Sequence, residues 1–191
     1  MAKLYFRYGT MGSGKSLDLL KVAYNYEENG MNVLILTSKI DDRYGNDIVK
    51  SRTGIHKDAI GLSDADDIWN IVEHHESKIS CILVDEVQFL TVKHIFQLAK
   101  IVDKMNIPVI CYGLRSDFKN SPFEATKYLM AIADELEEMK TICSICGKKK
   151  ASVNARLVDG KVVMEGIQIA IGGNELYKPM CRTCHTELLN L

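Results

Sequence analysis

The segment "GTMGSGKS" at residues 9–16 constrains the fold of this chain more than any other feature. It fits the pattern G-x-x-x-x-G-K-[ST], with an apolar stretch, "KLYFRY", before it and a helical pattern after it. Glycines let backbone N–H groups turn toward phosphate oxygens without a Cβ clash, and a helix N-terminus adds partial positive charge. A plain glycine-rich turn is the alternative. The flanking strand and helix patterns favour a phosphate-binding loop.

The residues of this loop have separate chemical roles. Lys15 can reach the β- and γ-phosphates of a nucleotide, and the Ser16 hydroxyl can bind Mg²⁺. The other positions supply backbone donors. The candidate nucleotide-binding residues of the loop are Gly9, Thr10, Met11, Gly12, Ser13, Gly14, Lys15 and Ser16.

Apolar runs alternate with helical patterns over the first two thirds of the chain. The runs at 32–38, 81–85 and 107–113 are continuously apolar, as in strands buried on both faces. Strands that alternate with helices predict a parallel sheet covered on both sides. The fold class is therefore α/β with a phosphate-loop core. Residues 41–58 are polar and glycine-punctuated, and we expect a long loop there.

Helical spacing predicts which side chains face the core. The inward residues expected in the three helices are Leu17, Leu20 and Tyr24, then Ile68, Ile71, Val72 and His75, then Val92, Ile95, Phe96, Ala99 and Val102. Gly30 is a plausible stop for the first helix, and Ser63 or an early Asp is the expected N-cap of the second.

Two adjacent carboxylates end the apolar run "CILVDEVQF". Asp85 closes a predicted strand, where it would face the Mg²⁺ held near Ser16. Neighbouring strand side chains point to opposite faces, so Glu86 is better placed at the mouth of the site, as a general base. The pattern alone leaves open whether the base activates water or a substrate hydroxyl. Val87 and Gln88, which follow, are grouped with the nucleotide site.

Six cysteines indicate a metal site rather than disulfides. "CSIC" and "CRTC" give two CxxC pairs, Cys143 with Cys146 and Cys181 with Cys184, which suit one tetrahedral zinc ion. "CRTCH" also fits the haem pattern, but the upstream pair completes a zinc set. Cys81 and Cys111 lie in apolar strands and are interpreted as core residues.

The chain changes character near residue 139, where the CxxC pairs and a basic run begin. We therefore predict two domains, a phosphate-loop α/β domain at 1–139 and a zinc-binding domain at 140–191. The 34 residues between Cys146 and Cys181 exceed the about 15–20 of a compact ribbon. A loop clamped at both ends by one metal suits the presentation of backbone to a ligand. Since the phosphate contacts lie in the first domain, we expect the zinc domain to serve nucleoside binding more than ATP binding.

Taken together, these motifs resemble a known family. "GTMGSGKS", "DDRY", "VDEVQF", "DF…SPF" and "IGGNELYKPMCRTC" occur in the order seen in the type II, zinc-containing thymidine kinases, and the resemblance runs along nearly the whole chain. It implies a RecA-like α/β core with a small zinc-bearing lasso domain. It also implies transfer of a phosphoryl group from ATP to the 5′-hydroxyl of thymidine or deoxyuridine, and a homotetramer.

The resemblance assigns further roles to residues at matching positions. Glu86 would take the 5′-hydroxyl proton, Arg43 would neutralise the transferring phosphoryl group, and Asp41 would join Asp85 and Ser16 around Mg²⁺. The implied nucleoside-binding residues are Met11, Phe89, Leu114, Phe118, Phe123, Ile171, Gly172, Gly173 and Tyr177. Phe89 and Phe123 could equally be core residues.

Composition bounds the remaining possibilities. The net charge of −1 argues against a nucleic-acid partner, and the chain shows no secretory signal and no apolar run of membrane-spanning length. We therefore expect a cytoplasmic protein with no membrane association. The alternative is a RecA-like ATPase whose zinc ribbon binds nucleic acid or protein, to which the basic "GKKKASVNARL" gives some support. A GTPase ranks low, because no N-K-x-D segment is present.

Overall fold

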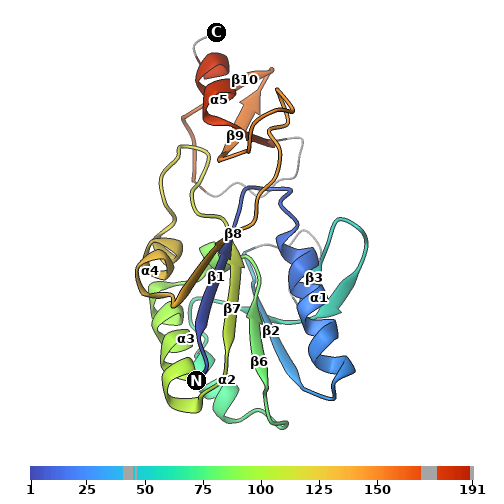
Figure 1. The fold of residues 1–191 in the computed structure, drawn as a ribbon. Helices are drawn as coiled ribbons and strands as arrows, with labels where there is room; N and C mark the ends of the chain where they lie inside the picture. Colours follow the sequence, from blue (N-terminus) through green and yellow to red (C-terminus); the bar gives the residue numbers. More distant parts are fainter. Residues whose placement is uncertain (41–44, 46, 169–175, 190–191) are drawn as a thin grey trace.

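A six-stranded parallel sheet forms the centre of the molecule in the computed structural model, which describes residues 1–40, 45, 47–168 and 176–189 (Figure 1). Each pair of neighbouring strands in this sheet runs parallel. In spatial order the strands are β5 (Ile60–Leu62), β2 (Val33–Ser38), β6 (Cys81–Val84), β7 (Val109–Gly113), β1 (Leu4–Tyr8) and β8 (Glu135–Glu138). The α/β class with a parallel sheet is thus confirmed.

Helices cover both faces of the sheet. On one face lies α1 (Lys15–Glu28), whose Leu19, Leu20 and Ala23 pack on alternate residues of β2, β6 and β7. The helices of the other face are α2 (Ile68–Glu73), α3 (Val92–Met105) and α4 (Glu124–Ile132), which share a second core cluster with the sheet. A short 3₁₀ turn, η1 (Val87–Phe89), follows β6. Because both faces are covered, the central strands are apolar throughout, as the sequence indicates.

Three of the predicted helix faces differ from the structure. Leu17 and Tyr24 are exposed on α1, since the buried stripe runs through Leu19 and Leu20 instead. Helix α2 ends at Glu73, so His75 lies beyond it and is exposed. Asp67, an early Asp, caps this helix by accepting a hydrogen bond from the Asn70 N–H.

Phe96 on α3 is the third difference. Its side chain is 50% exposed, whereas the expectation placed it inward. It packs against Tyr128 of α4 with the ring centroids 5.6 Å apart. An aromatic ring can therefore satisfy helical spacing and still lie at the rim of the core, between two helices.

The segment expected to be a long loop contains a β-hairpin in its described part. Strands β3 (Ile48–Lys50) and β4 (His56–Asp58) pair antiparallel. Val49 is buried in the cluster that also holds the core face of α1, and Lys57 forms an ion pair with Glu27 of that helix at 2.6 Å. The hairpin is therefore anchored on α1, and the loop prediction is wrong for the strands at 48–50 and 56–58.

The C-terminal residues form a separate small module. Its strands β9 (Val153–Val158), β10 (Lys161–Val163) and β11 (Tyr177–Met180) make an antiparallel sheet in the order β10-β9-β11, and α5 (Arg182–Leu189) follows. A two-residue turn joins β9 to β10, with positive φ at both Asp159 and Gly160, as such tight hairpins require. Figure 1 shows this module beyond the carboxyl ends of the central strands, with the N-terminus at the opposite end of the core.

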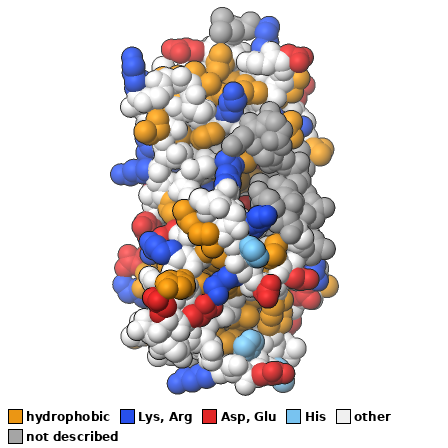
Figure 2. Space-filling view, turned by 90° about the vertical axis from the view of Figure 1, so that its right-hand side faces the viewer, with side chains coloured by type: hydrophobic (Ala, Val, Ile, Leu, Met, Phe, Trp, Pro, Cys, Tyr) orange, Lys and Arg blue, Asp and Glu red, His pale blue; other side chains and the backbone are white. Residues whose placement is uncertain are grey.

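The outer surface carries charges of both signs. On the face drawn in Figure 2, acidic and basic side chains are interspersed with apolar ones, and neither sign forms a continuous field. Among the described residues, no helix combines the length and the apolar character that crossing a membrane would need.

Candidate active site and cysteine cluster

A cavity of about 270 Å³ lies at the carboxyl ends of the central strands. Open parallel sheets bind ligands at this edge, because the loops that leave neighbouring strands diverge there. The walls come from the phosphate loop, the β3–β4 hairpin, the residues after β6, the loop 114–123 and the C-terminal module. This module is called the zinc module below, because it carries the four cysteines of the predicted zinc site. Five segments far apart in the sequence thus meet around one space.

The phosphate loop has the backbone geometry its sequence requires. Gly12 and Gly14 have φ values of +74° and +83°, which residues with a Cβ rarely adopt. A Cβ on Gly9 would lie 2.4 Å from the carbonyl oxygen of Met139. The Lys15 ammonium is buried and donates to the carbonyl of Thr10 at 2.9 Å. Its charge is therefore held at the loop.

Asp85 and Ser16 lie together beside this loop. Asp85 follows β6 directly and is 4% exposed. Burial raises the pKa of Asp85 to about 7 and the charge of Glu86 adds to that rise, while a hydrogen bond from Ser16 opposes it. Oxygen ligands of this kind are what Mg²⁺ prefers, and a cation would favour the ionised carboxylate. The donor set therefore fits magnesium.

Glu86 is half-buried, lines the cavity and has an unusual backbone conformation. Its φ is 48°, in the left-handed region, so the backbone turns away from the direction of β6 at this residue. The amide of Gln88 donates to the Glu86 carboxylate, and the Gln88 side-chain oxygen accepts the Leu114 N–H at 2.9 Å. Gly113 makes room for this amide, since a Cβ there would lie 2.6 Å from its oxygen. Gln88 thus ties the Glu86 carboxylate to the end of β7.

Aromatic rings form the apolar part of the cavity. Phe89 and Phe123 meet edge to face at 5.9 Å between centroids, and Phe118 meets Tyr177 of the zinc module at 6.4 Å. Met11 and Leu114 also line the space. Phe118 and Phe123 are almost fully buried, at 2% and 5% exposure, and yet line the cavity. For Phe123, the choice between pocket and core is therefore not exclusive, and Phe89 is half-buried and also lines the cavity.

The cavity also has polar walls that the sequence analysis did not single out. The additional polar lining residues include Lys50, Arg52, Asp117, Asn154 and Gln168. Asp117 accepts from Gln168 at 2.9 Å, which joins the loop 114–123 to the zinc module. Asp117 falls in "DF…SPF" but received no predicted role there, and the other four lie outside the family motifs, so only their three-dimensional neighbours place these residues at the cavity. Five predicted site residues, Asp41, Arg43, Ile171, Gly172 and Gly173, lie outside the described residues.

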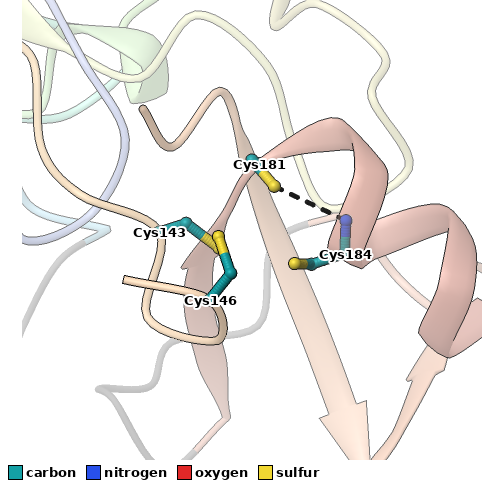
Figure 3. Close-up of side chains that lie close together, drawn as sticks. All are labelled: Cys143, Cys146, Cys181 and Cys184. Carbon is teal, nitrogen blue, oxygen red and sulfur yellow. Dashed lines mark hydrogen bonds between the residues drawn. The ribbon is translucent and has the colours of Figure 1, made fainter. Parts of the chain in front are cut away.

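The four cysteines of the CxxC pairs converge on one point (Figure 3). Cys143 and Cys146 come from the loop before β9, and Cys181 and Cys184 from the start of α5. Their sulfur atoms all lie within 4.8 Å of one another. Four sulfurs at ~2.3 Å from one zinc ion would be about 3.8 Å apart, so the cluster fits zinc with little adjustment.

The pKa values of these thiols also fit a metal-binding site. Burial raises the pKa of Cys143, but hydrogen bonds from backbone N–H groups of the cluster outweigh it and bring the pKa to about 6. The thiol of Cys184 has a pKa of about 12, chiefly because of the hydrogen bond with Cys181 and the crowding of the other sulfurs. Four sulfurs this close oppose each other's ionisation, and a divalent cation removes that conflict.

Comparison with known proteins gives one consistent result. A sequence model of the thymidine kinase family matches residues 2–185. A thymidine kinase of Listeria monocytogenes serotype 4b is 53% identical over 188 residues, which cover 98% of this chain and 98% of that protein. A thymidine kinase of Lactococcus lactis is 50% identical over 182 residues, with 95% and 96% of the two chains covered. The likeness therefore extends through both the α/β core and the cysteine module.

Proposed function

The chain belongs to the thymidine kinase family, and we propose that it transfers the γ-phosphoryl group of ATP to the 5′-hydroxyl of thymidine, with Glu86 as the general base. One observation carries the proposal beyond family membership. The phosphate loop, a carboxylate held at the cavity mouth and a set of aromatic walls open onto the same cavity. A hydrolytic ATPase needs the first two features but not an aromatic pocket beside them.

In the proposed reaction the 5′-oxygen of thymidine attacks the γ-phosphorus while the bond to the β–γ bridging oxygen breaks and ADP leaves. Glu86 accepts the proton that the 5′-hydroxyl loses. The hydrogen bond from Gln88 orients the Glu86 carboxylate for this role. Val87 and Gln88, together with the loop 9–16, complete the nucleotide side of the cavity.

Negative charge on the phosphates is met by several groups of the chain. Ser16 and Asp85, with Asp41, would hold Mg²⁺, which when bound neutralises charge on the β- and γ-phosphoryl oxygens. Lys15 supplies a buried ammonium at the loop. We assign a supporting role to Arg43 and to Arg52 of the hairpin, whose guanidinium lies 3.9 Å from where a Cβ of Gly12 would be.

The nucleoside would occupy the aromatic part of the cavity. Phe89, Phe118 and Phe123 would wall the base, and we expect this space to suit a pyrimidine better than the larger purine. Tyr177 closes it from the module, and main-chain groups of Ile171, Gly172 and Gly173 would meet the polar edge of the base. Deoxyuridine differs from thymidine only by one methyl group, so it should also be a substrate.

The remaining parts of the proposal concern the molecule as a whole. Zinc would be held by the four clustered cysteines, and the boundary between the core and the lasso domain would fall between residues 139 and 140. The family resemblance supports a homotetramer in the cytoplasm. The near-neutral net charge and the interspersed surface charges of Figure 2 support the absence of a nucleic-acid partner.

A nucleoside panel with ATP and Mg²⁺ tests this proposal. We expect 5′-monophosphate to form from thymidine and deoxyuridine, and not from deoxycytidine or purine nucleosides, because mismatched polar edges leave buried groups unpaired, at a cost of up to about 10⁴ in kcat/KM. ADP release without any nucleoside is the matched control. Comparable kcat/KM for deoxycytidine and thymidine would contradict thymine recognition. Nucleoside-independent ADP release at the full rate would instead favour an ATPase.

A further inference from the structure

A hydrogen bond joins the zinc module to the phosphate loop. The side-chain oxygen of Asn154, in β9, accepts the backbone N–H of Met11 at 2.8 Å. The two residues are 143 positions apart in the sequence. Asn154 is 5% exposed and Met11 is half-buried, so this hydrogen bond is partly shielded from water.

The position of Asn154 depends on the cysteine cluster. Strand β9 is the central strand of the module, and Asn154 pairs with Pro179 of β11 while its neighbour Val153 pairs with Met180. Cys181 comes directly after Met180, and the Ser144 N–H, next to Cys143, donates to the Pro179 carbonyl at 2.9 Å. The segments that carry the cysteines therefore hold β11, the strand that pairs with β9 at Asn154.

Met11 occupies a sensitive position in the phosphate loop. It lies between Thr10, whose carbonyl accepts from the Lys15 ammonium, and Gly12, whose φ is positive. The hydrogen bond from the Met11 N–H to Asn154 therefore fixes the backbone at this point of the loop. On one side lies the Thr10 carbonyl that accepts from the Lys15 ammonium, and on the other lie the N–H groups that follow Met11. Asn154 also lines the cavity itself.

We propose that Asn154 is a positioning residue for the phosphate donor, through which the zinc module completes the phosphate-binding loop. This inference rests on the proposed kinase function and adds to it a direct route from the cysteine cluster to the ATP site. Without the acceptor, the Met11 N–H loses its hydrogen bond to the module, and the loop gains freedom that ATP binding must then remove.

The same joint contains contacts that do not touch the loop, and these supply a control. The Arg115 guanidinium donates to the Ser152 carbonyl at 3.3 Å, and Lys150 pairs with Glu138 at 2.6 Å. Both hold the module on the core. Arg115→Ala therefore weakens docking of the module and leaves the acceptor for Met11 in place.

The experiment compares Asn154→Leu and Asn154→Ala with Arg115→Ala and the unsubstituted chain. Leucine has the same branched side-chain skeleton as asparagine but no acceptor, and alanine avoids the added bulk of leucine, so either variant that folds suffices. ATP affinity is measured by equilibrium binding without nucleoside, and steady-state kinetics give both KM values and kcat. Zinc content and Tm report whether the module is intact.

We expect the Asn154 variants to bind ATP about tenfold more weakly, which is the effect of one lost hydrogen bond. The KM for thymidine should change less than about twofold, and zinc should be retained. Arg115→Ala should leave ATP affinity near normal. Unchanged ATP affinity in a folded Asn154 variant overturns the proposal. So does an equal loss of ATP and thymidine affinity in both the Asn154 and Arg115 variants, which indicates docking alone. ATP binding without nucleoside is measured independently of phosphoryl transfer, so failure of the kinase assignment would be seen separately.

Discussion

At the scale of single residues, the conformation of Glu86 separates its role from that of Asp85. The turn to positive φ directs Glu86 away from the buried position of its neighbour. Without that turn, two adjacent strand residues would point to opposite faces of the sheet. The backbone therefore gives the two adjacent carboxylates different positions at the cavity.

Glu86→Gln tests the base. The amide keeps the size and hydrogen-bonding capacity of the side chain but cannot take a proton, so we expect kcat to fall by about 10²–10⁴. ATP affinity should remain nearly unchanged. Glu124→Gln, at an exposed carboxylate of α4, is the matched control and should behave like the unsubstituted chain. Turnover within a few-fold of normal in Glu86→Gln would remove Glu86 from this role.

The sequence predicts the contiguous part of the site well, because its chemistry is local. A phosphate loop needs its glycines and lysine at fixed spacing, and a CxxC pair places two thiols by itself. Asn154 lies outside the family motifs, and Asp117 falls in "DF…SPF" without a role that the sequence predicts. Their hydrogen bonds to Met11 and Gln168 depend on how the module seats on the core, and nothing in the sequence near either residue records that.

At the scale of elements, a polar network fixes α1 against the sheet. Asp18, in the first turn of the helix, accepts hydrogen bonds from Arg7 of β1 at 2.7 Å and from Tyr112 of β7 at 3.1 Å. Partial burial raises the pKa of Asp18, but Lys21, Tyr112 and Arg7 together outweigh it and hold the pKa below the usual value of 3.8. The helix that carries Lys15 and Ser16 is thus tied to two strands near its start.

Asp18→Asn should lower the free energy of unfolding at pH 7 by about 1–3 kcal/mol, the usual contribution of hydrogen bonds to a charged group. Since the pKa is depressed in the folded state, the stabilisation is complete above the unfolded value of 3.8 and is lost as pH falls through the folded value. Urea unfolding of both proteins from neutral to acid pH should therefore show the difference shrinking. Asp103→Asn, on the exposed face of α3, is the control. A difference that persists or grows in acid would contradict this assignment.

Element type was easier to predict than element orientation. The strands β2, β6 and β7 follow from apolar runs that leave little choice, whereas β5 and the acidic β8 of the same sheet carry no such run and are not predicted. The first helix has Leu17, Leu19 and Leu20 close together, so spacing alone fits more than one buried stripe. In the β3–β4 hairpin Val49 is the buried anchor and the flanking residues are polar or exposed, which gives too weak an alternation to read as strands.

At the scale of the whole molecule, the zinc module contacts both halves of the cavity. It reaches the phosphate loop through Asn154 and the aromatic pocket through Tyr177 and Gln168. The sequence predicts a role for the module mainly in nucleoside binding, because no motif marks the contact between Asn154 and the phosphate loop. The hydrogen bond to Met11 extends the expected influence of zinc to ATP.

Removal of zinc by a chelator, or the substitution Cys181→Ser, should therefore weaken the binding of both ATP and thymidine rather than of thymidine alone. Cys181 adjoins β11, which holds β9 and carries Tyr177, so loss of the metal loosens both contacts at once. Affinities for ATP and thymidine would be measured separately before chelation, after it, and after zinc is restored. Normal ATP affinity in zinc-free protein would show that the phosphate loop is independent of the module.

The outermost strand of the sheet bears on how copies of the chain behave at high concentration. Strand β8 has the sequence "ELEE", and its carboxylates form ion pairs with Lys3, Arg7 and Lys150 of the same molecule. An incoming strand from another copy would have to break these pairs and strip water from the carboxylates before it could extend the ladder. The opposite edge, β5, is only three residues long. The sheet thus resists edge-to-edge growth into fibrils.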